Sequence, residues 1–135
     1  HYFRALVSMQ ILNHLAGFAV NALNRSIYID PKHPPNDFVG AIMLPASIAL
    51  LRYRSHDKEL TISIENRLGD SVTEFSKVIT RSDRKPFSAE VALNQVRIDV
   101  SRIDFDSDNK LAVIELNRSI RLREGDILSI SLRYE

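Results

Sequence analysis

The stretch EGDILSISLRY (residues 124–134) shows most plainly how this chain folds. From Leu128 to Tyr134 an apolar residue stands at every second position, and serine or arginine stands between them. That period of two is typical of a strand with one buried side and one side facing solvent. Glu124-Gly125-Asp126 has the composition of a tight turn. The end of the chain is therefore predicted to be a half-buried strand entered through a turn.

Working outward from this strand, similar short segments recur along the chain between turn-forming residues. Residues 96–105 read as one long or bulged strand that changes face near Ser101. Short strands at this spacing favour a mainly β fold, an antiparallel β-sandwich over residues 18–135. The other expected strands cover residues 25–29, 38–44, 47–53, 60–65, 72–80 and 111–116.

The segment before the strands has a helical composition. Residues 2–16 contain no proline, and Gly17 is a natural helix stop. The apolar residues leave no broad polar face, so this helix needs cover on most sides. We expect the helix of residues 1–17 to pack on the remainder of a larger polypeptide or on a partner protein. The apolar positions are Phe3, Leu6, Val7, Met9, Ile11, Leu12 and Leu15.

The composition limits the kinds of binding partner and the cellular location that we expect for this chain. A chain of 135 residues, 44% of them hydrophobic, fits one globular domain. The 18 basic and 17 acidic residues give a net charge of +1, which argues against nucleic acid as a partner. The absence of cysteine removes disulfides and thiolate chemistry, and we expect a cytoplasmic location. The longest apolar stretch, residues 5–20, is too short and interrupted to span a membrane.

The motifs of common enzymes are missing from this sequence. There is no Gly-x-Ser-x-Gly elbow and no glycine-rich phosphate loop, and no two of the four histidines have the spacing of helical metal ligands. Glycoside chemistry needs two carboxylates, and Asp30, Asp37 and Glu65 are available. Nothing in the sequence brings two of them together. We therefore expect no complete catalytic site and no cofactor beyond the calcium ion considered next.

One group of carboxylates has the spacing of a calcium loop. Asp104, Asp106 and Asp108 alternate, and Glu115 stands at the twelfth place counted from Asp104. The alternative is a plain turn, because Asp106 to Asn109 is good turn sequence between two strands. In that arrangement Glu115 lies on the returning strand, away from Asp104. The turn is the preferred interpretation, and calcium stays open.

A series of short motifs runs along the N-terminal part of the chain: Tyr2-Phe3-Arg4-Ala5, Leu15-Ala16-Gly17-Phe18, Ser26-Ile27-Tyr28-Ile29, Asp30-Pro31, Pro34-Pro35 and Phe38. This series resembles the end of the catalytic barrel in (α/α)6 glycoside hydrolases, most of all the bile-acid β-glucosidase (non-lysosomal glucosylceramidase) family. The strands Leu50-Leu51-Arg52-Tyr53-Arg54 and Glu59-Leu60-Thr61-Ile62-Ser63-Ile64 are similar to strands of the maltose phosphorylase and glucoamylase group, which is second. The resemblance covers about residues 2–64.

The chain departs from that family at two places. Ser8 and Met9 stand where the last barrel helix often carries tryptophan, and residues 44–47 replace an aromatic Gly-Trp-Gly stretch. In such families the nucleophile and the acid/base carboxylate lie upstream in barrel loops, so no family catalytic residue maps onto this chain. The resemblance implies the C-terminal, non-catalytic segment of a β-glucosidase-like glycoside hydrolase, supporting its barrel.

Two other functions remain open from the sequence. The first is a stand-alone β-sandwich that binds carbohydrate or another protein and uses the helix as a docking segment. The second is a β-sandwich subunit of a viral or secretion assembly.

Overall fold

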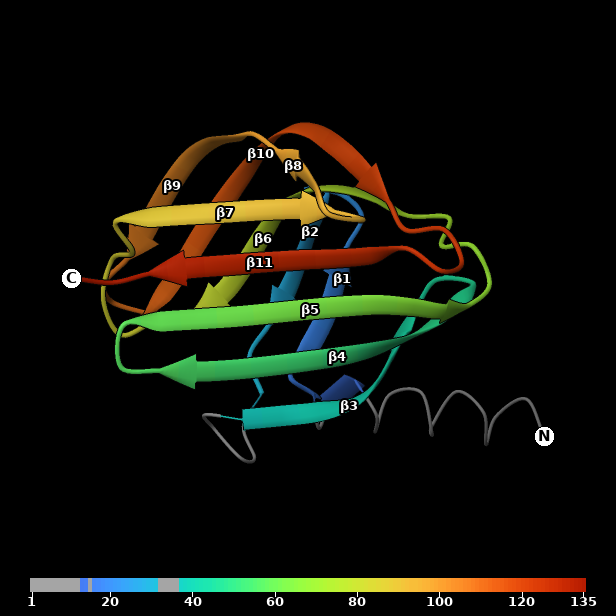
Figure 1. Cartoon of the computed structure of the whole chain (residues 1–135), viewed down its shortest axis with the longest axis horizontal. Helices are drawn as coiled ribbons and strands as arrows, with labels where there is room; N and C mark the ends of the chain where they lie inside the picture. Colours follow the sequence, from blue (N-terminus) through green and yellow to red (C-terminus); the bar gives the residue numbers. More distant parts are fainter. Residues whose placement is uncertain (1–12, 15, 32–36) are drawn as a thin grey trace.

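The computed structural model describes residues 13–14, 16–31 and 37–135. In this part of the chain eleven strands form two sheets that pack face to face. Figure 1 shows the six-stranded sheet in front and the five-stranded sheet behind, with strands that cross those in front at a steep angle. The prediction of a mainly β, antiparallel sandwich is confirmed for these residues.

The five-stranded sheet has the order β1-β2-β6-β10-β9. Neighbouring strands are antiparallel except for β2 and β6, which run parallel. Strand β10 changes register between Glu115 and Ile120. The strands are β1 (Phe18–Asn21), β2 (Ser26–Ile29), β6 (Glu74–Arg81), β9 (Val100–Asp106) and β10 (Leu111–Arg121).

The six-stranded sheet has the order β3-β4-β5-β11-β7-β8, and every neighbouring pair is antiparallel. Strands β3 and β8 are therefore its edges. The strands are β3 (Asp37–Leu44), β4 (Ser47–His56), β5 (Glu59–Leu68), β7 (Ser88–Leu93), β8 (Val96–Ile98) and β11 (Ile127–Arg133).

The core lies between the two sheets and is built by the alternation seen in the sequence. Leu128, Ile130 and Leu132 of β11 are almost fully buried, whereas Ser129 between them is exposed. Ile114 of β10, in the other sheet, belongs to the same buried cluster. Burying one such aliphatic side chain stabilises a fold by about 1.5–3 kcal/mol. One shared core therefore holds both sheets together.

The segment from 96 to 105 differs from the prediction of one long strand. It forms two strands that belong to different sheets, because the chain leaves the six-stranded sheet after Ile98 and enters the five-stranded sheet at Val100. The predicted change of face is thus a crossing between sheets at Asp99. Strands β1 and β7 were not predicted.

The predicted helix over residues 1–17 lies almost wholly outside the described residues and stays a prediction. Near its end, Asn13, His14 and Ala16 have a helical backbone conformation. Gly17 follows with a φ of +59°, the left-handed conformation typical of a helix stop. Among the described residues, no helix has the length and apolar character needed to cross a membrane.

Gly17 is required by its surroundings as well as by its backbone angle. Its carbonyl accepts a hydrogen bond from the N–H of Asp30 at 2.8 Å, and a Cβ at position 17 would overlap the carbonyl oxygen of Asp30. Gly125 has a similar φ of +88°, but a Cβ there would meet nothing within 4 Å. A comparison of substitutions at Gly17 and Gly125 can therefore separate the cost of backbone strain from the cost of steric overlap.

We predict that Gly17→Ala destabilises the fold more than Gly125→Ala. The left-handed backbone alone costs a non-glycine residue about 1–3 kcal/mol, and only Gly17→Ala adds the overlap with Asp30. Urea unfolding followed by circular dichroism measures both free energies. Equal losses in the two variants would show that the close approach of Gly17 to Asp30 contributes nothing.

Candidate functional site

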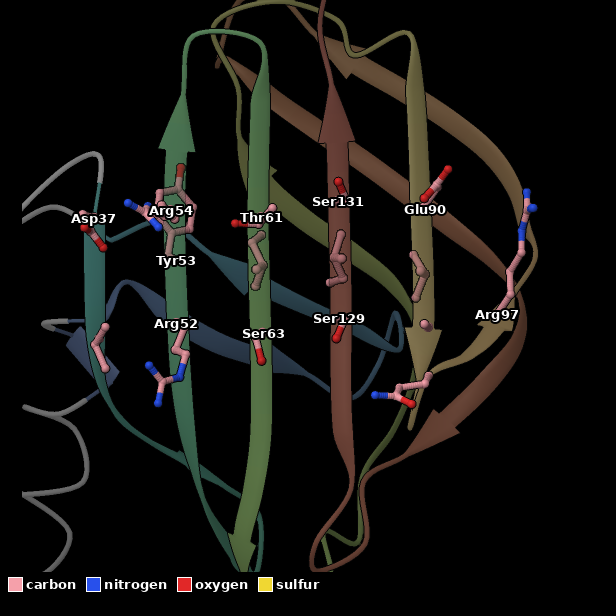
Figure 2. Close-up of a pocket in the computed structure, with 16 residues that line it drawn as sticks. Asp37, Arg52, Tyr53, Arg54, Thr61, Ser63, Glu90, Arg97, Ser129 and Ser131 are labelled. Atoms are coloured by element: carbon pink, nitrogen blue, oxygen red, sulfur yellow. The ribbon is translucent and has the colours of Figure 1, made fainter.

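The outer face of the six-stranded sheet is hollowed into an open groove of about 700 Å³. Its lining residues come from β3, β4, β5, β11 and β7, from β8 and from the turn that precedes β8. In Figure 2 the labelled serine and threonine side chains lie in the middle of this sheet and the labelled charged side chains lie toward its sides. The volume lies within the range of small-ligand sites.

Strand register arranges the lining residues in two rows that run across the strands. The arginine row consists of directly opposed residues on successive strands, with an arginine on β4 and another on β8. It contains no carboxylate. Its members, from β3 to β8, are Val39, Arg52, Ser63, Ser129, Ala92 and Arg97.

The second row lies two residues away from the arginine row on each strand from β3 to β7, and we call it the acidic row. It carries one carboxylate at each end, on β3 and on β7, and one arginine. In Figure 2 this row lies above the arginine row. Its members, from β3 to β7, are Asp37, Arg54, Thr61, Ser131 and Glu90.

The floor of the groove is a patch of four hydroxyl groups on two neighbouring strands. Thr61 lies opposite Ser131, and Ser63 lies opposite Ser129. The Ser131 hydroxyl donates a hydrogen bond to Glu59 at 2.9 Å. A hydroxyl both donates and accepts hydrogen bonds, so this floor suits a ligand with many polar groups of both kinds.

The arginines of the groove have no carboxylate partner. Among the described residues, no carboxylate oxygen lies within 4.0 Å of Arg52, Arg54 or Arg97, while five ion pairs form elsewhere. The remaining residues of the chain include neither Asp nor Glu, so they add no side-chain carboxylate. Exposed guanidinium groups beside a hydroxyl floor can bind carboxylate or phosphate groups in a bidentate manner.

Sequence reasoning did not find this groove. The alternation in β4, β5 and β11 predicts which side chains face outward, but it does not say which strands are neighbours. Arg52 and Arg97 share a row only because β5, β11 and β7 lie between their strands. A strand order would have been needed to place them together.

The three carboxylates considered for glycoside chemistry have separate surroundings. Asp30 is buried and binds Arg81 through both oxygens, at 2.8 and 3.2 Å. Asp37 lines the groove, and Glu65 pairs with Arg67 at 3.1 Å. Both Asp30 oxygens are held by a guanidinium, and Tyr28 donates to one of them. Asp30 is therefore a structural anchor between β2 and the end of β6.

Tyrosines surround this anchor at one end of the sandwich. Burial raises the pKa of Tyr53 to about 12, and the nearby Tyr134 adds to the shift. Burial also raises the pKa of Tyr134, whose hydroxyl shares a 2.8 Å hydrogen bond with Ser82. The hydrogen bond from Arg81 to Asp30 raises the pKa of that guanidinium. These groups keep their ordinary protonation states near neutral pH, which fits a structural network.

We predict that stability falls with rising pH between about 10 and 12, in part because of Tyr53. In that range the unfolded chain releases the Tyr53 proton at its ordinary pKa of 10.0, while the folded chain retains it. Tyr53→Phe removes this contribution and should make the decline shallower. Urea unfolding at about pH 9 and about pH 11 measures this fall in the free energy of unfolding for each protein. Equal declines in wild type and Tyr53→Phe would contradict the burial of this hydroxyl.

The candidate calcium residues lie on a β-hairpin formed by β9 and β10. Asp106 accepts hydrogen bonds from the backbone N–H groups of Asp108 and Asn109, and its other oxygen accepts one from the Asn109 side chain. These bonds lower the pKa of Asp106. The predicted turn from Asp106 to Asn109 is confirmed.

The other two candidates have partners of their own. Asp104 accepts a 2.8 Å hydrogen bond from Arg102, and Glu115 pairs with Lys77 of β6 at 3.3 Å. Across residues 13–14, 16–31 and 37–135, no three Asp, Glu or His side chains are grouped closely enough to hold a metal. Calcium binding here stays the untested alternative to the plain turn, and titration with Ca²⁺ tests it.

We expect Ca²⁺ to leave the melting temperature unchanged, whereas Asp106→Ala should lower it. The variant removes the three hydrogen bonds that hold the turn. Differential scanning fluorimetry of metal-free protein, with and without Ca²⁺, measures both effects. Asp108→Ala is the matched control, because the Asp108 side chain forms none of these bonds. A rise in melting temperature with Ca²⁺ that Glu115→Gln abolishes would establish the ion site instead.

Comparisons with known proteins show a similarity in structure. No family model matches the chain, and no curated protein matches it. Among solved structures, it is similar to an alpha-L-rhamnosidase from Dictyoglumus thermophilum, with 13% sequence identity and a TM-score of 0.45. The match covers 89% of this chain and 12% of that protein, so the chain spans about an eighth of its length.

Proposed function

We propose that this chain is a non-catalytic β-sandwich domain of a glycoside hydrolase and braces the catalytic part of that enzyme. The observation that carries the proposal is the attachment of the segment before β1 to the edge strand β3. The side-chain amide of Asn13 accepts a hydrogen bond from the N–H of Met43 at 2.7 Å and donates one to its carbonyl at 3.1 Å. The amide thus occupies both backbone groups of an edge residue, as a neighbouring strand would.

The attachment continues into the core. Ala16 is fully buried in the cluster that both sheets share, and Gly17 is hydrogen-bonded to Asp30. A flexible linker forms no such contacts and is rich in glycine and serine. Asn13, Ala16 and Gly17 instead attach the chain to the sandwich just before β1. That is the property needed by a domain that supports a unit placed before it.

The chemistry of the described residues agrees with a supporting role. Asp30 is held by Arg81 and Glu65 pairs with Arg67, whereas Asp37 lines the groove, so the three carboxylates have separate surroundings and do not form an acid and base pair across one bond. The resemblance of residues 2–64 to the end of an (α/α)6 barrel implies that the catalytic carboxylates would lie upstream. The sandwich would then cover the flank of the barrel.

The coding sequence upstream of His1 and the activity of the chain test this proposal together. We expect an open reading frame for a helix-rich region, and hydrolysis of a nitrophenyl β-glucoside by the longer protein only. In that longer protein, Asn13→Ala should lower the melting temperature and the temperature at which activity is lost. Two hydrogen bonds to a partly buried backbone are worth about 1–3 kcal/mol.

Asn117→Ala is the control, because Asn117 is exposed on β10 and its side chain forms no hydrogen bond within the described part of the chain. A start codon or a stop codon directly upstream would overturn the proposal. So would hydrolysis by the 135-residue chain itself.

A further inference from the structure

The groove on the six-stranded sheet has no part in the bracing role, and its charges are unevenly distributed. All the carboxylates that line it, Asp37 and Glu90, lie in the acidic row. The arginine row has a guanidinium at each side and only hydroxyl and small apolar side chains between them. Its net charge is therefore positive from β4 to β8.

The spacing of the two arginines defines the size of a ligand. Arg52 on β4 and Arg97 on β8 are four strand steps apart, which is about 19 Å along the sheet at 4.7–4.9 Å per step. The hydroxyls of Ser63 and Ser129 lie between them. An extended ligand that crosses the strands can meet an arginine at each end and hydroxyls in the middle.

The lining argues for an anionic ligand over a neutral one. Neutral sugars are commonly held by stacking on exposed aromatic rings. Tyr53 is the only aromatic residue among those that line the groove, and it is 5% exposed. Affinity must therefore come from charge and hydrogen bonds, which here are the guanidinium groups and the hydroxyl floor.

The lining also argues for a saccharide over a peptide. An extended peptide usually binds a sheet by adding to an edge, where backbone groups are free. The groove lies on a face, and the backbone groups beneath it are used in the ladder with neighbouring strands. Val39 and Ala92 are the only outward apolar side chains in the two rows. Peptide side chains would find little to pack against.

From these observations we propose that the arginine row binds an acidic oligosaccharide, a chain of sugars that carries carboxylate groups. Carboxylates pair with Arg52 and Arg97, and sugar hydroxyls bond to Ser63 and Ser129. Glu90 of the acidic row opposes the ligand by charge repulsion. The site does not depend on the bracing role, because it holds whether or not a catalytic unit precedes the chain.

Oligogalacturonate is the probe that tests this site, with its fully methyl-esterified form as the neutral control. We expect isothermal titration calorimetry to detect binding of the acid form only, and to detect weaker binding at higher salt. Arg52→Gln and Arg97→Gln should each weaken binding about two- to fivefold, the loss expected for an exposed ion pair. Glu90→Gln should strengthen it, and Ser129→Trp should block it.

Arg118→Gln is the matched control, since Arg118 is exposed on β10 in the other sheet. It should leave affinity unchanged, and circular dichroism should show all variants folded. Several outcomes would overturn the proposal: no binding, equal binding of the methyl ester, weaker binding in Glu90→Gln, or the same loss in Arg118→Gln. Tighter binding of an acidic peptide such as oligoglutamate would assign the groove to a protein partner instead. None of these results tests whether an open reading frame lies upstream of His1, so failure of this proposal is distinguishable from failure of the proposed function.

Discussion

Everything in this fold depends on one hydrophobic core that two sheets must share. Each sheet presents one apolar face, and neither face can stay exposed to water. The chain therefore crosses from one sheet to the other several times, as at Asp99 between β8 and β9. Where strands end, polar side chains form hydrogen bonds with backbone groups. Asn66, which is fully buried, donates hydrogen bonds to the carbonyls of Gly69 and Leu122 where β5 and β10 end.

The sequence predicts those parts of the fold that depend on local alternation. Strand β11 is clear because its buried and exposed residues alternate without interruption. Strand β7 was missed because Ser-Ala-Glu-Val-Ala-Leu has little alternation, and only Val91 is fully buried in it. The parallel pairing of β2 with β6 joins segments far apart in the sequence, so no local pattern reports it.

The candidate sites also differ in whether local sequence or long-range strand pairing forms them. The turn from Asp106 to Asn109 was predictable because its residues hydrogen-bond to their own neighbours. The groove was not, because its two rows are made by strand order and register. A face built in this way carries chemistry that none of its strands shows alone. The proposed bracing through the edge strand β3 and the proposed binding on the outer face would use different surfaces of one sheet, so one domain has room for both.

The parallel pairing of β2 with β6 also governs the order of events during folding. Ile29 and Thr80 lie side by side, yet 51 positions separate them. On a ribosome, the hairpin of β1 and β2 emerges early but must wait for β6, which it joins at the end of a long closed loop. Contacts of high sequence separation form slowly. The β2 edge of the first hairpin therefore stays unpaired until β6 is available, and an unpaired strand edge is a site at which strands can pair wrongly.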